Sequence, residues 1–338
     1  MNRERFLAIT SRYASLRVAI CGDFCLDRYL EIDPQKKEIS IETGLPVHNV
    51  VRVRSQPGAA GTILNNLSAL GAGTIWPIGF AGDDGEGFEL MRALAQTPGV
   101  RMDYFVQTAE RRTFTYCKPL VMEPGGTPRE LNRLDSKNWT PTPASVEREL
   151  ARKLQQAARE ADCVMVLDQV DLANTGVITQ AMLAALGELQ RDRDGLLVLA
   201  DSRRGLSDFP PLTFKMNSAE LQALLGKEHA GDLEHIRASA VSLARRNRRS
   251  VFVTLSERGI LGASPEGASE HVPALPVRGP IDIVGAGDAV SANLLMALAS
   301  GASLREALEV ANAAASVVVH KLGTTGTASV DEIQHVLF

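Results

Sequence analysis

Short, continuous apolar runs, separated by longer segments with helical periodicity, are the feature that most restricts how this 338-residue chain can fold. Apolar runs without a polar side are typical of strands that are covered on both faces of a parallel sheet. The candidate strands are Val18–Cys21, Thr74–Ile78, Cys163–Leu167, Leu196–Ala200 and Val251–Leu255. The helical patterns are Gly87–Ala95, Ala144–Ala161, Thr175–Gln190 and Leu233–Arg246. This alternation predicts an α/β fold with right-handed crossovers, and we expect residues 1–338 to form one domain.

Two segments have a different pattern and predict a smaller sheet that projects from this domain. Residues 26–57 contain many charges, and their apolar residues alternate with polar ones from Val47 to Arg54. Residues 104–122 include a second stretch of this kind, which begins at Arg111. Alternation suits strands that have one face in solvent. We therefore expect the two segments to form a small β-sheet lid.

The composition and charge argue against several classes of partner. Hydrophobic residues make up 45% of the chain and charged residues 22%, which is ordinary for a globular protein with a sizeable core. A formal net charge of -4 gives no basic footprint for nucleic acid and no polybasic signal for a membrane surface. No apolar stretch is long enough to span a bilayer, and residues 1–5 do not lead into a signal peptide. We expect no nucleic-acid or membrane partner and a cytoplasmic location.

The segment Asp282–Asp288 (DIVGAGD) contains the residues best suited to phosphate chemistry. It precedes the Ala- and Leu-rich helical segment Ala289–Ser300. A Gly-Ala-Gly turn at a helix N-terminus leaves backbone N–H groups without partners and therefore favours an anion. Asp288 would lie in the first turn, where its carboxylate could accept the proton of an attacking hydroxyl group. The local sequence suits an ordinary helix start equally well, because a short glycine-rich loop is a weak signal.

Other motifs for nucleotides and catalysis are missing from the sequence. It contains no GxxxxGK[ST] P-loop, no GxGxxG dinucleotide fingerprint and no set of protein-kinase loops. HExxH and GxSxG do not occur either. The missing fingerprint disfavours a Rossmann-type oxidoreductase, although the alternation of strands and helices fits one.

An ordered series of segments resembles the PfkB (ribokinase-like) family of sugar and nucleoside kinases across nearly the whole chain. Asp282–Asp288 is similar to the C-terminal signature of that family. The other similar segments are Val18–Tyr29 (VAICGDFCLDRY), Pro57–Ala72 (PGAAGTILNNLSALGA), Gly79–Gly87 (GFAGDDGEG), Asn217–Glu220 (NSAE), Thr254–Gly259 and Asn312–Thr325 (NAAASVVVHKLGTT). The resemblance implies a three-layer α/β/α sandwich with a mostly parallel central sheet and a β-sheet lid. It also implies that the protein phosphorylates a substrate hydroxyl group with ATP.

The resemblance assigns roles at the phosphate end of the site. Asp288 would be the catalytic base. The anion hole would be formed by Gly285, Ala286 and Gly287. Asn217 and Glu220 would order Mg²⁺ and the phosphates through water, although the same pair also suits a helix-capping box. Residues on the nucleotide side would be Thr254, Ser256, Gly259 and Asn312, and the closing segment would adjoin a monovalent cation such as K⁺.

Within the family, the resemblance is strongest to the kinase domain of bacterial heptose 7-phosphate kinases, which implies a sugar or sugar phosphate as substrate. It rests on Gly22–Tyr29, Ile39–Val47, Asn132–Asp135 and Val317–Thr324. Residues on the substrate side would be Asp23, Asp27, Gly58, Ala59, Thr62 and Asp282. Asp23 and Asp27 suit sugar hydroxyl groups because a carboxylate accepts hydrogen bonds from neighbouring hydroxyls. Asp27 could instead pair with a base at the surface.

Departures from the family pattern affect the substrate more than the chemistry. The usual Gly-Gly is Gly58-Ala59 here, and an Asn that contacts the substrate is Thr62. In the heptose-kinase branch, a Tyr and a Lys follow the acid that corresponds to Asp168, and this chain lacks both. A substrate phosphate group needs a cation. The candidates to replace the missing Lys are Lys118, Arg133, Arg203 and Arg204.

Two other functions on the same fold remain open at this point. A nucleoside kinase is disfavoured by the aromatic content of 5%, because a base is usually stacked on aromatic rings. A non-catalytic relative that binds a sugar or nucleotide is disfavoured by the intact Asp282, Gly-Ala-Gly turn and Asp288. The lids of related kinases pair between subunits, and exposed sheet edges favour such pairing. We therefore expect a homodimer through the lid.

Overall fold

An eight-stranded sheet forms the middle of the protein, in a computed structural model that describes residues 1–123, 125–226, 232–323 and 325–338. Its order is β15-β14-β13-β12-β11-β10-β1-β4, and all neighbours from β4 to β13 are parallel. The strands are β1 (Arg17–Gly22), β4 (Thr74–Ile78), β10 (Cys163–Asp168), β11 (Leu197–Ser202), β12 (Thr213–Asn217), β13 (Val251–Thr254), β14 (Ile260–Ala263) and β15 (Ser269–Val272). Thr324, at the end of one segment that resembles the kinase family, lies outside the described residues.

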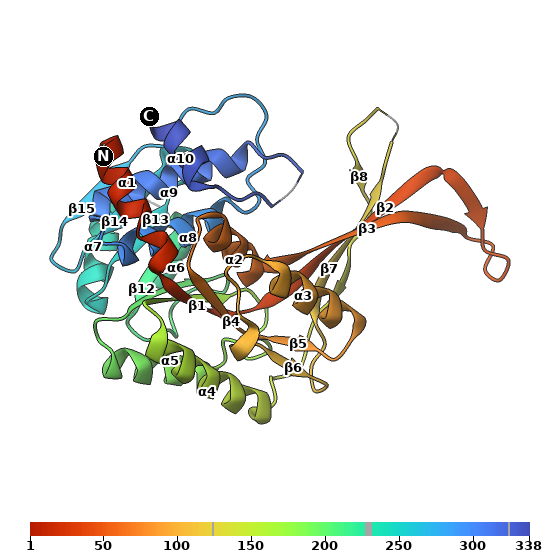
Figure 1. Cartoon of the computed structure of the whole chain (residues 1–338), viewed down its shortest axis with the longest axis horizontal. Helices are drawn as coiled ribbons and strands as arrows, with labels where there is room; N and C mark the ends of the chain where they lie inside the picture. Colours follow the sequence, from red (N-terminus) through yellow and green to blue (C-terminus); the bar gives the residue numbers. More distant parts are fainter. Residues whose placement is uncertain (124, 227–231, 324) are drawn as a thin grey trace.

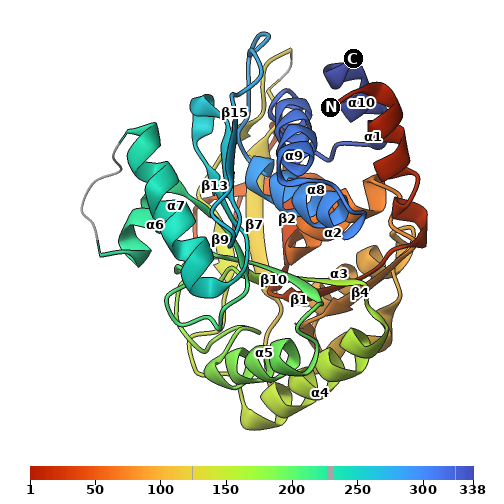
Figure 2. The same cartoon turned by 90° about the vertical axis from the view of Figure 1, so that its left-hand side faces the viewer.

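Helices cover both faces of this sheet and complete a three-layer α/β/α sandwich (Figure 2). On β1, Val18 and Ile20 pack into one hydrophobic cluster, whereas Ala19 and Cys21 pack into the other. Neighbouring residues of a strand point to opposite faces, so a strand covered on both sides needs an unbroken apolar run. The helices are α1 (Arg3–Thr10), α2 (Ala60–Ala69), α3 (Gly85–Gln96), α4 (Ala144–Glu160), α5 (Gln180–Asp192), α6 (Ser218–Leu224), α7 (Leu233–Asn247), α8 (Ala286–Ala299), α9 (Leu304–Val319) and α10 (Val330–Leu337). The expected α/β class is confirmed.

The helices start and stop near the residues that periodicity predicts, with one clear exception. α5 begins at Gln180 and not at Thr175, because Thr179 caps it by accepting a hydrogen bond from the N–H of Met182. No apolar run predicts β12, because Lys215 interrupts its pattern. Among the helices of the described ranges, none combines the length and the apolar character that crossing a membrane requires.

A second, five-stranded sheet projects from the sandwich as a lid, and the long hairpin of β2 and β3 reaches furthest from the body (Figure 1). Its strands are β2 (Phe24–Ile39), β3 (Pro46–Ala59), β7 (Phe114–Val121), β8 (Arg129–Glu130) and β9 (Leu134–Ser136). The segment expected from Tyr104 to Met122 enters this sheet only at Phe114. Before that point, β6 (Val106–Thr108) pairs with β5 (Phe80–Gly82), and the buried guanidinium group of Arg111 donates to body carbonyl groups. These bonds hold residues 109–113 against the body.

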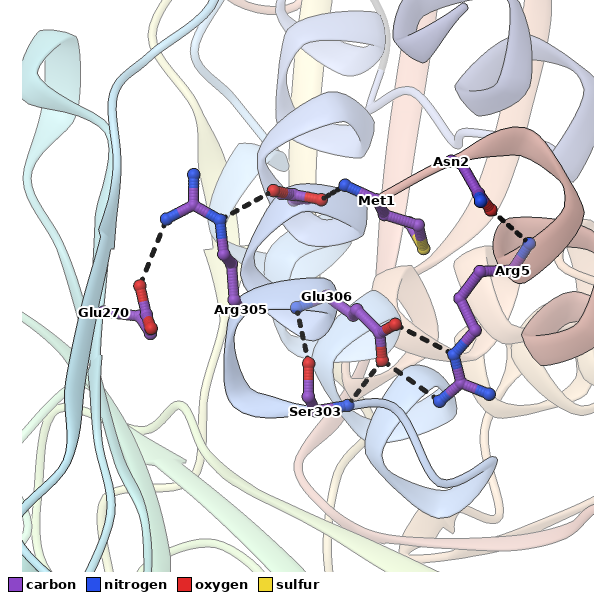
Figure 3. A network of polar contacts seen from close by, with 8 residues as sticks. Met1, Asn2, Arg5, Glu270, Ser303, Arg305 and Glu306 are labelled. Carbon is purple, nitrogen blue, oxygen red and sulfur yellow. Dashed lines mark hydrogen bonds and ion pairs between the residues drawn. The ribbon is translucent and has the colours of Figure 1, made fainter.

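A network of ion pairs fixes α9 between α1 and the edge strand β15 (Figure 3). The guanidinium group of Arg5 donates to both carboxylate oxygens of Glu306, at 2.8 and 3.1 Å. These bonds lower the pKa of Glu306 to about 2. Arg305 pairs with Glu270 of β15 at 3.1 Å. Because α9 also carries Asn312, the network steadies one wall of the cavity described below.

Candidate active site

The polar groups of the site lie at the carboxyl ends of the parallel strands, beside the base of the lid. Open α/β sheets place ligands at this edge because the connections there diverge. β11 carries Asp201 near its end, and β12 ends in Asn217. The first turn of α8 and the lid strand β2 contribute Asp288 and Asp27. Body and lid therefore both supply side chains to one region.

Asp288 is a partly buried acid in the first turn of α8. Burial raises the pKa of Asp288 to about 7; the carboxylates of Asp201 and Asp27 also raise it, and the ammonium group of Lys215 opposes them. These influences show that charged groups from two body strands and one lid strand act on the same carboxylate. A group with a pKa near 7 can accept a proton at neutral pH and release it again.

Lys215 is a charged group of the site that the sequence analysis missed. It lies on the buried strand β12, is 7% exposed, and donates to Asp201 Oδ2 at 2.7 Å. Burial alone would lower the pKa of Lys215, but Asp201, Asp288 and Glu220 raise it above its ordinary value, so the side chain stays an ammonium ion. Ser291 of α8 donates to the same Asp201 oxygen at 3.3 Å. A lysine between apolar strand residues is rare unless it is paired. This rarity could have identified Lys215 as a candidate site residue from the sequence.

The turn before α8 has the geometry of an anion site, with one amide fewer than expected. Gly285 is the N-cap residue, and its φ of 83° lies in the left-handed region that favours glycine. The N–H of Ala286 donates to the carbonyl group of Ile283 at 3.2 Å, so this amide is already used. At a helix start, the amides of Gly285 and Gly287 have no acceptor inside the helix. A Cβ at Gly287 would lie 3.2 Å from Lys215 Nζ, so this turn adjoins the ammonium group.

A cavity of about 370 Å³ lies next to this turn. Its wall includes all the residues expected on the nucleotide side, which are Thr254, Ser256, Gly259 and Asn312. Ala286 and Gly287 line the end at the glycine turn. Asn312 Nδ2 donates to the carbonyl group of Pro273 at 2.8 Å and thereby fixes the wall. Most of the remaining lining is apolar, which suits a planar base with a few polar contacts.

Asn217 and Glu220 form a complete capping box at the start of α6. Asn217 Oδ1 accepts the N–H of Glu220 at 2.9 Å, and Glu220 Oε2 accepts the N–H of Asn217 at 2.7 Å. Burial and the charge of Asp201 raise the pKa of Glu220, which places it beside the charged cluster. Across the described ranges, no group of three or more Asp, Glu, His or Cys side chains could hold a metal ion directly. Mg²⁺ usually keeps several waters and takes one or two carboxylates, so Glu220 fits a water-mediated contact.

Asp27 is the expected substrate-side acid that belongs to the charged cluster. Its carboxylate is largely buried on β2, and Lys118 Nζ of β7 lies 3.8 Å from Oδ1. Burial raises the pKa of Asp27, whereas Lys118 and Arg133 lower it. A Cβ at Gly58 would lie 2.6 Å from Asp27 Oδ2, so a side chain at this position of β3 would collide with the carboxylate. The negative charge of Asp27 is also one of the causes that raise the pKa of Asp288.

Two other acids expected on the substrate side bind backbone groups instead. Asp23 is 3% exposed, and its carboxylate accepts the N–H groups of Gln169 at 2.8 Å and Val177 at 2.7 Å. It therefore joins β1 to the loop after β10, and the structure does not offer it to a sugar hydroxyl. Asp282 Oδ1 accepts the N–H of Val284 at 3.0 Å and shapes the turn before α8. Sequence patterns cannot reveal such partners, because they come from distant or irregular segments.

The two departures from the family pattern lie at the start of α2. Thr62 is buried in the first turn of this helix. Ala59 is the N-cap residue, with φ of 54° and ψ of −118°. This conformation suits glycine and strains a residue with a Cβ. The methyl group of Ala59 packs against both hydrophobic clusters of the sandwich.

Comparison with known families matches residues 24–331 to the family described as pfkB family carbohydrate kinase. Among curated proteins, "Bifunctional protein HldE" from Gluconacetobacter diazotrophicus is 32% identical over 328 residues, which cover 95% of this chain and 63% of that protein. The protein of the same name from Pelobacter propionicus is 30% identical over 342 residues, which cover 99% of this chain and 66% of that protein. The chain thus spans slightly less than two thirds of the length of these relatives.

Solved structures have the same fold at low sequence identity. Phosphofructokinase-2 from Escherichia coli in complex with potassium superposes with a TM-score of 0.73 at 21% identity, over 95% of this chain and 98% of that one. Ribokinase from Arabidopsis thaliana complexed with ribose and ATP gives a TM-score of 0.69 at 18% identity, with the same coverage of both chains. The expected ribokinase-like fold is confirmed.

The strained Ala59 predicts a gain of stability on substitution by glycine. We expect Ala59→Gly to raise the free energy of unfolding by about 1 kcal/mol, because relieved strain of 1–3 kcal/mol exceeds the lost methyl packing and the added entropy of the unfolded chain. Ala69→Gly, at the last residue of the same helix, is the matched control. This substitution should lower the free energy of unfolding by about 1 kcal/mol. Urea denaturation measures both changes. Loss of stability in both variants would show that Ala59 carries no strain.

Proposed function

Because this chain belongs to the pfkB family of carbohydrate kinases, we propose that it transfers the γ-phosphate of ATP to a hydroxyl group of a phosphorylated sugar of the heptose 7-phosphate type. The observation that carries this proposal is the charged cluster of Asp288, Lys215 and Asp27 between the nucleotide cavity and the lid. The cluster contains a base, a cation for the transferred group and an acid for the acceptor.

The nucleotide cavity supports ATP as the phosphate donor. Its apolar wall suits the adenine base, and its end at Ala286 and Gly287 would receive the phosphates. The amides of the glycine turn and the ammonium group of Lys215 would stabilise the negative charge on the transferred phosphoryl group. Such positioning and charge stabilisation account for most of the catalysis in phosphoryl transfer.

Asp288 would act as the base during in-line transfer. The oxygen of the sugar hydroxyl bonds to the γ-phosphorus while the bond from phosphorus to the β,γ-bridging oxygen breaks, and ADP leaves. The hydroxyl proton passes to Asp288. Asp27 would accept a hydrogen bond from the sugar and hold the acceptor hydroxyl in place. A lid over the acceptor would exclude water and so limit wasteful hydrolysis of ATP.

Mg²⁺ and a monovalent cation complete the expected set of cofactors. Glu220 and Asn217 would hold Mg²⁺ through water, and the ion would neutralise charge on the phosphates. The capping box does not prevent this role for Glu220, since the hydrogen bond to Asn217 uses one of its two carboxylate oxygens. A K⁺ ion near the closing segment stays a prediction.

Two of the cations considered for a substrate phosphate favour a phosphorylated acceptor. Lys118 Nζ lies 3.8 Å from Asp27 Oδ1, and Arg133, which pairs with Asp135 at 2.7 Å, also lowers the pKa of Asp27. Arg204 instead pairs with the fully buried Asp168 at 2.8 Å, and Arg203 pairs with an exposed acid at the surface. The first two are therefore the better candidates to replace the Lys that the heptose-kinase branch carries elsewhere.

An ATP-consumption screen tests the function. Free sugars, sugar phosphates including heptose 7-phosphate, and nucleosides are offered to the wild type and to Asp288→Asn. We expect turnover with a sugar phosphate and a fall in kcat of about 10²–10⁴-fold in the variant, the usual contribution of a general base. Asp208→Asn, at an exposed acid after β11, is the control and should keep wild-type turnover. Near wild-type turnover in Asp288→Asn would exclude Asp288 as the base, and turnover of nucleosides alone would exclude a sugar acceptor.

The pKa of Asp288 predicts how activity depends on pH. Only the ionised carboxylate accepts a proton, so kcat/KM should rise with pH up to about 7 and level off above it. Lys215 lowers this pKa, so Lys215→Met should move the rising limb to higher pH as well as slow the reaction. Lys153→Met on the distant helix α4 should not change the pH at which kcat/KM rises. A kcat/KM that does not change through this range would show that no group with a pKa near 7 must be ionised.

Exposed apolar residues on the lid hairpin support a second copy of the chain as partner. Val51 and Val53 of the edge strand β3 are 53% and 46% exposed, and among the strands that the structure describes β3 pairs on one side only, with β2. An unpaired apolar edge of this kind favours coverage by another strand. We expect sedimentation velocity to show a dimer that Val51→Lys with Val53→Lys converts to a monomer. Leu7→Lys, at an exposed leucine of α1, should leave the dimer intact; a monomeric wild type would contradict the proposal.

A further inference from the structure

One carboxylate of helix α3, that of Glu89, binds both strands of the lid hairpin near its base. Glu89 Oε1 accepts a hydrogen bond from Arg28 of β2 at 2.7 Å, and Glu89 Oε2 accepts one from Ser55 of β3 at 2.6 Å. Arg28 and Ser55 are directly opposite each other in the ladder of β2 and β3. One side chain of the body therefore clamps both strands of the hairpin at the same level.

This clamp lies next to the substrate-side acid in the sequence but on the other face of the lid. Asp27 precedes Arg28, and its cross-strand partner Gln56 follows Ser55. Successive residues of a strand point to opposite faces and are about 3.3 Å apart along it. A displacement of Arg28 relative to the body therefore moves Asp27 by a similar amount.

The third lid strand is fastened to the same helix at its first turn. Asp84, the N-cap residue of α3, accepts the N–H of Thr113 at 3.0 Å and the Thr113 hydroxyl at 2.7 Å. Thr113 directly precedes β7, the strand that carries Lys118. Burial would raise the pKa of Asp84, but the hydrogen bonds from Thr113 and Gly87 lower it below its ordinary value, so the cap stays charged.

We infer that α3 sets the position of the lid relative to the catalytic base and that Glu89 is a positioning residue for the acceptor sugar. The inference rests on the proposed kinase function of the site. Asp27 and Lys118 reach the acceptor from the lid, whereas Asp288 and the nucleotide cavity belong to the body. Their relative placement therefore depends on the bonds that join lid and body, and a displacement of about 1 Å can cost 10²-fold in rate.

Kinetics of Glu89→Ala and Glu86→Ala test this role. Glu86, on the same helix, makes longer ion pairs with Arg28 at 3.9 Å and Arg112 at 3.8 Å, so it is the matched control. We expect Glu89→Ala to lower kcat/KM for heptose 7-phosphate by about tenfold and to leave KM for ATP within about twofold, because the nucleotide site lies in the body. Glu86→Ala should change both by less than about twofold. The inference would be overturned if Glu89→Ala impaired the kinetic constants for heptose 7-phosphate and for ATP equally. It would also be overturned if Glu89→Ala and Glu86→Ala had equal effects.

A distance measurement decides the same question without any substrate. Spin labels are attached at Ile41→Cys on the lid tip and at Glu149→Cys on α4, and pulsed EPR measures the distance between them. The native cysteines are all buried and so resist labelling. We expect Glu89→Ala to shift or broaden the distance distribution, and Ser55→Ala, which removes one of the two bonds, to do so less. Unchanged distributions in both would overturn the inference even if the kinase assay succeeds. A shifted distribution in a protein without kinase activity would keep the clamp and reject the proposed function.

Discussion

The ion pair between the buried ammonium group of Lys215 and the carboxylate of Asp201 is the interaction on which the site depends. Lys215 donates to Asp201 at 2.7 Å, and its charge opposes the raised pKa values of Asp288 and Glu220. Without this cation, the pKa values of Asp288 and Glu220 would rise further, because burial and the charge of Asp201 already raise both. Removal of one partner from a buried ion pair typically costs about 3–5 kcal/mol. β12 thus contributes the cation that pairs with the carboxylate of Asp201 on the neighbouring strand β11.

The fold divides the site between the packed layers of the sandwich and the projecting lid. Asp288 lies in the first turn of α8, which packs against α9, and the ion pairs of Arg5 and Arg305 hold α9 against two neighbouring elements. The nucleotide cavity is therefore built from the packed layers of the sandwich. The lid hairpin, in contrast, has exposed valines; its first residues, Phe24 and Leu26, are buried in the core, and further out it meets α3 through the polar contacts of Glu89. Polar contacts at one end of a long hairpin restrict its base more than its tip.

Much of the fold could be predicted from the sequence, because two-sided burial leaves an unbroken apolar run in each central strand. The same rule missed β12, where Lys215 replaces one apolar residue. The residues expected on the nucleotide side lie together: Thr254 and Asn312, for example, are distant in sequence but line one cavity. Asp23 was misinterpreted because its partners are backbone N–H groups of an irregular loop, and no side-chain pattern encodes them. The lid boundary at Phe114 depends on hydrogen bonds of Arg111 that are equally invisible in the sequence.

The electrostatics of the site link the position of the lid to the strength of the base. Asp27 belongs to a lid strand, and its negative charge is one of the causes that raise the pKa of Asp288. Coulomb energy falls with distance, so a lid that swings away lowers this pKa, and a lid that closes raises it. A higher pKa makes the carboxylate a stronger base as long as it is ionised. The contact of Lys118 with Asp27 limits this effect, because it partly neutralises the acid that approaches. In the proposed mechanism, the lid would therefore act on the chemistry through charge as well as through the exclusion of water, and the contact between Asp27 and Lys118 would limit the effect of charge.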